Sequence, residues 1–162
     1  MPDIVPCLWY DSEAEEAANF YCGVFPNSKI IHISHYPAGS EEWPSNKPEG
    51  SVLMVEFTLD GKPFMALNGG PIFKFNHAIS LPIMCKDQKE IDYYWDKLTE
   101  GGAEDPCGWL RDKYGLSWQV VPTLLMEYQH SPDQALRKRV MDSYMQMKKY
   151  DIETLKKAAA GA

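Results

Sequence analysis

Residues 107–122 read CGWLRDKYGLSWQVVP, and this stretch decides the class of fold. Its apolar residues form two short runs, 107–111 and 116–121, which are separated by residues 112–115, DKYG. Short apolar runs joined by a turn that ends in glycine predict two antiparallel strands. Pro122 has no backbone N–H to donate to a neighbouring strand, so we expect the sheet to end there.

A strand and a helix are expected before these two strands. Asp87 is a favourable helix N-cap, and Glu90 follows at the spacing of a capping box. One face of the predicted helix is apolar and is formed by Ile91, Tyr94, Trp95 and Leu98. Gly101 and Gly102 end the helix. Upstream of it, residues 77–85 predict a strand.

The first half of the chain has the same order of elements. Residues 4–10 are a short apolar run, and Ser12 with Glu15 has the spacing of a second capping box. The helix that follows is expected to end near Phe25, ahead of Pro26. Further strands are predicted at residues 29–36, 51–59 and 62–67.

The order strand, helix, strands therefore occurs twice. We predict an α+β fold of two βαβββ modules, at about residues 4–70 and 77–122, whose curved mixed sheets surround a cleft. The two modules form one domain, residues 1–122, and residues 123–162 form a C-terminal helical extension. Helices are expected in this extension at residues 132–147 and 152–159. A concave surface between repeated units is a preferred place for a small-molecule pocket.

Composition narrows the possible partners. The 162 residues carry a net charge of −7, which disfavours a nucleic-acid partner. The sequence has no run of 18 apolar residues, so we expect no membrane span. The first residues carry neither a basic region nor an apolar signal core, and we expect a cytoplasmic protein. None of the four cysteines forms a CxxC pair, and we expect Cys7, Cys22 and Cys85 to be small core residues.

Four segments carry a resemblance to a known family: residues 15–29 (EEAANFYCGVFPNSK), 61–76 (GKPFMALNGGPIFKFN), 87–98 (DQKEIDYYWDKL) and 107–122 (CGWLRDKYGLSWQVVP). The tail segment 145–158 (MQMKKYDIETLKKA) also fits this family. They resemble the PhnB-like branch of the vicinal-oxygen-chelate (glyoxalase/bleomycin-resistance/dioxygenase) superfamily. Members of this branch are often labelled 3-demethylubiquinone-9 3-methyltransferase-like. The resemblance implies a glyoxalase-like domain of two βαβββ modules and a homodimer.

The residues do not support the methyltransferase label. A nucleotide-type methyl donor usually lies on a glycine-rich turn that follows a strand in an open α/β sheet. Residues 68–71, NGGP, instead separate two halves that we expect to be antiparallel, and Pro71 cannot donate an N–H. We interpret this segment as a turn. Asn68 is a candidate substrate-binding residue at the edge of the cleft, with turn formation as the alternative.

Metal-dependent members of the superfamily hold a divalent ion at four positions. Carried over by the resemblance, these positions fall at Pro6, at Met65 or Ala66, near Ser80 or Leu81, and at Gln119. Divalent ions of this kind prefer imidazole or carboxylate ligands, which these positions lack. We therefore predict no resident metal and no other cofactor. The alternative is a divalent ion held by His77 and Gln119.

Five residues are candidates for binding a small molecule: Asn68, His77, Cys107, Trp109 and Gln119. The alternative for His77 is a hydrogen-bonded residue at the rim of the site, and for Gln119 it is the satisfaction of buried backbone groups. The first hypothesis is a binding protein, or an enzyme of unassigned activity, that holds a small, partly aromatic molecule. A metal-dependent lyase, isomerase or dioxygenase and a drug-sequestering resistance protein are the alternatives.

Overall fold

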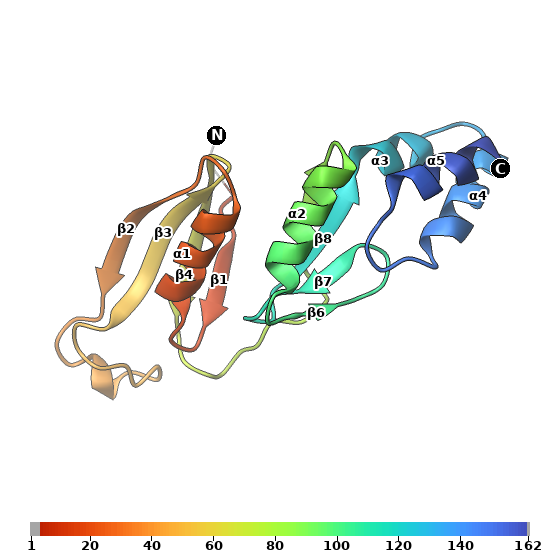
Figure 1. Cartoon of the computed structure of the whole chain (residues 1–162). Helices are drawn as coiled ribbons and strands as arrows, with labels where there is room; N and C mark the ends of the chain where they lie inside the picture. The colour runs from red at the N-terminus through yellow and green to blue at the C-terminus, as the bar shows by residue number, and fades with distance from the viewer. Residues whose placement is uncertain (1–3, 162) are drawn as a thin grey trace. The chain divides into compact units, whose positions relative to one another are not determined.

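The computed structural model describes residues 4–161 (Figure 1). The chain divides between Phe75 and Asn76 into two compact units, which are described separately. The second unit includes the C-terminal extension. None of the helices within residues 4–161 is long and apolar enough to cross a bilayer.

The first unit has the predicted βαβββ order. Strand β1 (Cys7–Tyr10) is followed by helix α1 (Ala14–Val24), and strands β2 (Lys29–His35), β3 (Val52–Leu59) and β4 (Lys62–Asn68) follow. A short 3-10 helix, η1 (Ser40–Glu42), lies between β2 and β3. The strand order is β1-β4-β3-β2, with β1 parallel to β4 and the other neighbours antiparallel. The sheet is therefore mixed, as predicted.

The second unit repeats this topology. It contains β5 (Leu81–Cys85), α2 (Gln88–Thr99), β6 (Ala103–Glu104), β7 (Trp109–Arg111) and β8 (Ser117–Pro122). The strand order is β5-β8-β7-β6, and β5 is parallel to β8. The described part of the extension forms α3 (Thr123–Gln129), α4 (Gln134–Tyr144) and α5 (Ile152–Ala160). The two βαβββ modules and the α+β class are confirmed.

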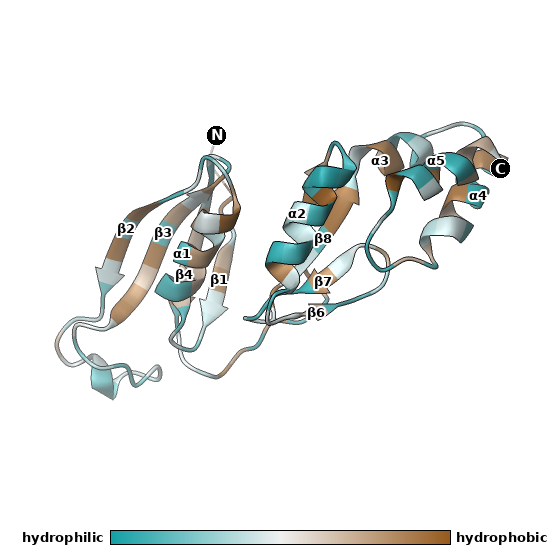
Figure 2. Ribbon diagram, in the orientation of Figure 1, coloured by the Kyte–Doolittle hydropathy of each residue, from teal (hydrophilic) through white to brown (hydrophobic). Residues whose placement is uncertain are grey.

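In each unit a helix covers one face of the sheet, and the core lies between them (Figure 1). Small residues of α1, Ala14, Ala17 and Ala18, are fully buried and let the helix approach the sheet closely. In α2 the buried residues are larger: Ile91, Trp95 and Leu98 are buried as predicted, whereas Tyr94, predicted on the same face, is half-buried. Hydrophobic residues are concentrated along β3 and β8 (Figure 2), which supply Val55, Phe57, Trp118 and Val120 to the two cores.

The N-terminus of α1 differs from the sequence prediction. Ser12 does not cap the helix, which begins at Ala14 after Glu13. The backbone N–H of Ala14 instead donates to Asn68 Oδ1 at 2.8 Å, although 54 positions separate the two residues. Because Asn68 is the last residue of β4, the sheet itself caps the helix. Ser12 Oγ accepts a hydrogen bond from Lys47 Nζ at 2.9 Å.

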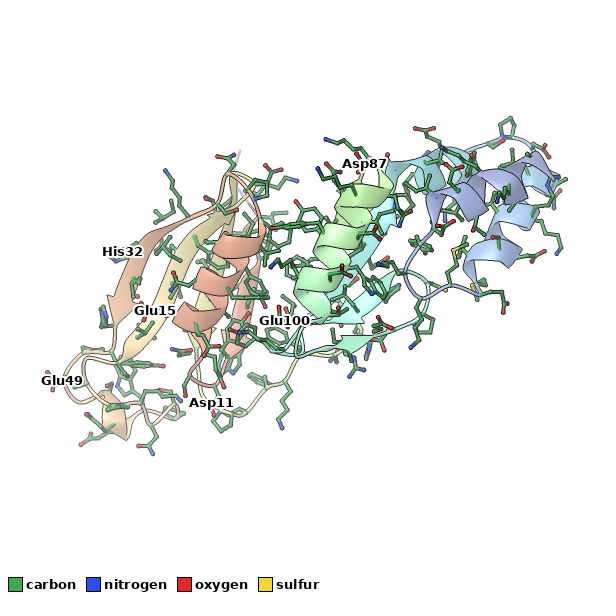
Figure 3. All side chains as sticks on the ribbon, in the orientation of Figure 1. Asp11, Glu15, His32, Glu49, Asp87 and Glu100 are labelled. Carbon is green, nitrogen blue, oxygen red and sulfur yellow. The ribbon has the colours of Figure 1, made fainter. Side chains whose placement is uncertain are left out.

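The capping of α2 agrees with the prediction. Asp87, at the start of α2 in Figure 3, accepts a hydrogen bond from the backbone N–H of Glu90 at 2.9 Å. The Glu90 carboxylate completes the cap by accepting from the backbone N–H of Lys86 at 2.9 Å. The sequence pattern was sufficient to predict this cap, because each hydrogen bond of the cap joins residues no more than four positions apart.

Several predicted boundaries were wrong. The strand predicted at 77–85 begins at Leu81, because residues 77–79 form a turn and a bend. The strand predicted at 107–111 begins at Trp109, since Cys107 and Gly108 both have left-handed backbone conformations, with φ of 60° and 76°. Strand β6 and helix α3 were not predicted at all. β6 has only two residues, which is too short for an alternation pattern.

Cys7, Cys22 and Cys85 were expected to be core residues, and one of the three, Cys85, is buried. Cys85 is fully buried, and burial raises the pKa of its thiol to about 12. Cys22 is half-buried and Cys7 is exposed. Cys7 is exposed because it points away from α1, as the burial of the next residue, Leu8, indicates.

We expect the replacement of Asn68 with alanine to lower the free energy of unfolding by about 2 kcal/mol, because it leaves buried backbone groups without partners. Asn68 Nδ2 also donates to the carbonyl of Val52 at 3.0 Å, and the residue is 4% exposed. Urea denaturation followed by circular dichroism measures the loss. The matched control is Ser12→Ala, because Ser12 was the predicted cap and does not cap α1. Its free energy of unfolding should change by no more than about 0.5 kcal/mol. Equal losses in the two variants would contradict the assignment of the cap.

Candidate functional site

The face of the second sheet that lies opposite α2 is the candidate site. Helix α2 packs on β7 and β8. Leu110, Trp118 and Val120 are buried, and side chains alternate along a strand. Trp109 and Gln119 therefore point to the opposite side, where both are half-buried. We call this side the open face of the second sheet.

Trp109 and Gln119 are brought together by the pairing of β7 with β8. They are register partners across the antiparallel pair, and Gln119 is in turn the partner of Pro82 across the parallel pair with β5. Gln119 Nε2 donates to Ser80 Oγ at 2.8 Å. The open face therefore combines an indole ring with an amide and a hydroxyl, which together suit a ligand that is partly aromatic and partly polar.

A charged cluster lies at the edge of the open face. Arg111 is two residues after Trp109 and so points to the same side of β7. Its Nε donates to Asp105 Oδ2 at 3.0 Å and its Nη2 to Asp105 Oδ1 at 3.3 Å. His77 Nε2 lies 3.3 Å from Asp105 Oδ2. The open face thus has one carboxylate between a guanidinium and an imidazole.

The cluster explains the titration of its members. The hydrogen bonds from Arg111 hold the pKa of the Asp105 carboxyl below its usual range, and His77 adds to this effect. In return the Asp105 carboxylate raises the pKa of Arg111. The Asp105 side chain is 21% exposed and that of His77 is 57% exposed, so the imidazole remains accessible to solvent and to a ligand.

The sequence prediction included His77 and missed Asp105 and Arg111. It named Ser80 only as one of the positions that the resemblance implies for a metal. The argument that placed His77 on a strand was wrong, since the residue lies in the turn before β5. Asp105 and Arg111 approach each other because β6 and β7 form a tight antiparallel pair, with Ala103 opposite Arg111. The only sequence signal for this pair was an acidic residue just before the strand predicted at 107–111 and a basic residue at the end of that strand.

Cys107 lies in the turn that leads into Trp109. Its side chain is half-buried, and its Sγ lies 3.7 Å from Met145 Sδ in the extension. It is near Trp109 in sequence but is not part of β7. A role for Cys107 in substrate binding stays a prediction, as do the roles of His77, Trp109 and Gln119.

Asn68 belongs to the first unit and has a structural task there. Its amide bonds to Ala14 and Val52, and its backbone carbonyl accepts from the Tyr36 hydroxyl at 2.5 Å. It therefore lies on the side of β4 that α1 covers. A role in substrate binding stays a prediction for this residue too, but the observed bonds already use both polar atoms of its amide.

The following turn also has a packing role. A Cβ at Gly69 would lie 2.1 Å from the Trp9 ring, and Gly70, at φ 90°, accepts a hydrogen bond from Trp9 Nε1 at 2.9 Å. The two glycines are needed for this close approach of backbone and indole. The turn leads into residues 71–80, which contain no helix, so no helix N-terminus is available there for a nucleotide-type cofactor.

The four positions implied for a metal lack the donor atoms that a divalent ion prefers. Pro6 and Met65 are adjacent, because the Met65 N–H donates to the Pro6 carbonyl at 2.9 Å, while Ala66 is buried. Ser80 and Gln119 are adjacent in the second unit. The side chains are an aliphatic ring, a thioether, a hydroxyl and a neutral amide, and they do not fit a divalent ion. Within residues 4–161, no three His, Cys, Asp or Glu side chains are grouped to hold a metal ion.

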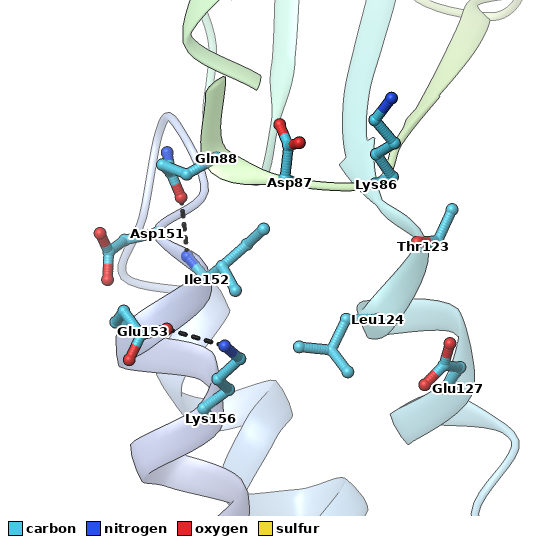
Figure 4. A pocket seen from close by; sticks show the side chains of 10 residues that line it. All are labelled: Lys86, Asp87, Gln88, Thr123, Leu124, Glu127, Asp151, Ile152, Glu153 and Lys156. Atoms are coloured by element: carbon cyan, nitrogen blue, oxygen red, sulfur yellow. Dashed lines mark hydrogen bonds and ion pairs between the residues drawn. The ribbon is translucent and has the colours of Figure 1, made fainter. Parts of the chain in front are cut away.

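A separate cavity of about 440 Å³ lies where the extension joins the module (Figure 4). It lies between the start of α2, the start of α3 and the start of α5. Gln88 links the walls, since its Oε1 accepts from the Ile152 N–H at 2.9 Å. Asp87 and Asp151 each cap their own helix. None of the predicted binding residues lines this cavity, and its polar groups serve the junction.

Comparisons with known proteins identify the family. Residues 2–121 match the family described as 3-demethylubiquinone-9 3-methyltransferase. A similar solved structure is a putative 3-demethylubiquinone-9 3-methyltransferase, PhnB protein, from Bacillus cereus, with 35% identity and a TM-score of 0.65. The match covers 75% of this chain and 100% of that one. Comparison with functionally curated proteins gives no match.

Two other solved structures are similar in fold alone. A Pseudomonas aeruginosa protein has 17% identity and a TM-score of 0.59, over 75% of this chain and 98% of that one. The fosfomycin resistance protein FosX from Listeria monocytogenes has 12% identity and a TM-score of 0.52, over 78% of this chain and 97% of that one. The chain thus belongs to the 3-demethylubiquinone-9 3-methyltransferase family, the PhnB-like branch of the vicinal-oxygen-chelate superfamily.

Proposed function

We propose that the chain binds a small, partly aromatic molecule on the open face of the second sheet, as a binding protein or as an enzyme of unassigned activity. The observation that carries the proposal is the pairing of Trp109 with Gln119, whose amide bonds to Ser80. An indole presents a flat apolar surface to an aromatic ring, and the neighbouring amide and hydroxyl supply directional hydrogen bonds. Such a combination is typical of small-molecule sites.

The charges at the edge of the site limit the ligand class. Asp105 balances the charge of Arg111, so the open face carries little net positive charge while the carboxyl is ionised. A neutral polar ligand, or one with a single acidic group near His77, fits this balance better than a polyanion does. Methyl transfer through a nucleotide-type donor is not part of the proposal, because the glycines at 69 and 70 are used in packing against Trp9.

The oligomeric state and the location of the protein also belong to the proposal. We also propose a homodimer in the cytoplasm, which the family resemblance and the acidic, span-free sequence support. Light scattering on the purified chain measures the oligomeric state directly.

Thermal-shift screening of small aromatic acids and amides is expected to find a stabilising ligand. For that ligand, Trp109→Ala and Gln119→Leu should each weaken binding at least about tenfold, because each removes a principal contact. The control is Trp43→Ala, which removes a 47% exposed tryptophan of the first unit. Calorimetry measures the affinities. Unchanged binding in both site variants, with binding lost in the control, would place the site elsewhere.

Metal analysis tests our expectation that the chain holds no resident divalent ion. Protein purified without an affinity tag is expected to contain far less than one divalent ion per chain, because the donor set is neutral and lacks imidazole at the implied positions. Mass spectrometry of the acid-digested protein measures the metal content. A stoichiometric ion that disappears in His77→Ala would refute this expectation and favour a metal-dependent reaction.

The charged cluster predicts a pH dependence of stability. Because the pKa of Asp105 is lowered in the folded protein, its ion pair stabilises the fold above the unfolded pKa and is lost as the pH falls. Asp105→Asn should therefore be less stable than the unsubstituted protein at pH 7, and the difference should close from about pH 5 towards about pH 2. Urea midpoints at several pH values measure this. Asp142→Asn, in an exposed pair with Lys138, is the control and should show little difference at any pH.

A further inference from the structure

The segment of the extension that connects α4 to α5 contacts the turn that precedes Trp109. We call residues 145–150 the strap. The backbone N–H of Cys107 donates to the Met147 carbonyl at 2.8 Å, and that of Gly108 donates to the Lys148 carbonyl at 2.7 Å. The strap lies beyond residue 121, where the match to the family ends.

Tyr150 is the central residue of this contact. It is 4% exposed, and its hydroxyl donates to the Cys107 carbonyl at 2.7 Å. Burial raises the pKa of the phenol, so it remains protonated and able to donate. Its ring lies over Gly108, where a Cβ would be only 2.3 Å from the Tyr150 Cε2 atom. Only glycine leaves room for the ring, and the left-handed φ of Gly108 also favours glycine.

The strap is itself held in place from the side of α2. Gln88 Nε2 donates to the Tyr150 carbonyl at 3.0 Å, and Gln88 Oε1 accepts from the Ile152 N–H at 2.9 Å (Figure 4). Lys149 pairs with Asp92 at 3.0 Å. These bonds connect the turn before β7, through the strap, to the first turns of α2. The position of the turn therefore depends on residues that are distant from it in sequence.

We infer that Tyr150 is a positioning residue for Trp109, through which the C-terminal extension shapes the open face of the second sheet. The turn that Tyr150 holds ends at Gly108, and Trp109 is the next residue. The backbone N–H of Val120 donates to the Gly108 carbonyl at 2.8 Å and fixes the other side of the turn. The effect of Tyr150 on ligand binding rests on the proposed function. Its effect on the position of Trp109 does not.

The test removes only the hydroxyl, in Tyr150→Phe, and observes Trp109 without any ligand. The five tryptophans are labelled with 5-fluorotryptophan and followed by ¹⁹F NMR, with the Trp109 signal assigned from Trp109→Phe. We expect the Trp109 signal to shift or broaden while Trp9 and Trp43 of the first unit keep their positions. Amide exchange at Cys107 and Gly108 should accelerate at least about tenfold, because the turn loses an anchor.

Tyr128→Phe is the matched control, since Tyr128 is a half-buried tyrosine of α3 in the same extension. It should leave the Trp109 signal in place. Faster exchange at Gly108 with an unchanged Trp109 signal would overturn the inference, as would the same shift in the control. If Tyr150→Phe does not fold, Gln88→Ala loosens the strap from the α2 side and should give the same Trp109 response. A failed ligand screen would refute the proposed function without changing these spectra.

Discussion

The parallel pairing of the first and last strands of each module is the constraint on which the structure depends. β1 pairs with β4 and β5 with β8, in both cases in parallel. Parallel neighbours cannot be joined by a tight hairpin, so a crossover must pass over the sheet. Helices α1 and α2 lie on that path and each covers one face. The opposite face is left for a ligand or for another surface, and the candidate site follows directly from this asymmetry.

The two modules share this topology but differ in chemistry at equivalent places. The places compared are the residue just before the first strand and its neighbour in the last strand. In the first module these are Pro6, before β1, and Met65 of β4. In the second module they are Ser80, before β5, and Gln119 of β8. The first pair offers no charged or directional side-chain donor, and the second offers an amide and a hydroxyl. Of these two equivalent places, the one in the second module therefore presents the polar side chains. Neutral groups of this kind bind a ligand by hydrogen bonds and packing and do not hold a divalent ion tightly.

The C-terminal extension holds the turn that precedes β7 in the second module. Its strap accepts the two backbone N–H groups of the turn at Cys107 and Gly108, which would otherwise lack partners in the sheet. In doing so it determines where β7 begins and how Trp109 enters the open face. Residues 145–150, which lie beyond the matched residues 2–121, can thus adjust a site in the matched part of the chain.

The sequence by itself determined the class of fold, because helix caps such as Asp87 and the turn glycines are local signals, and the repeated order of elements is visible without coordinates. It also determined that Trp118 and Gln119 point to opposite faces of one strand, since strand alternation is a local rule. Only the tertiary structure decided three other matters: that Asn68 caps α1 from a distant strand, that Asp105 and Arg111 pair beside His77, and that the extension holds the turn before Trp109. Each of these depends on contacts between residues that are brought together only when strands pair and the chain returns on itself, and such contacts leave no periodic pattern in the sequence.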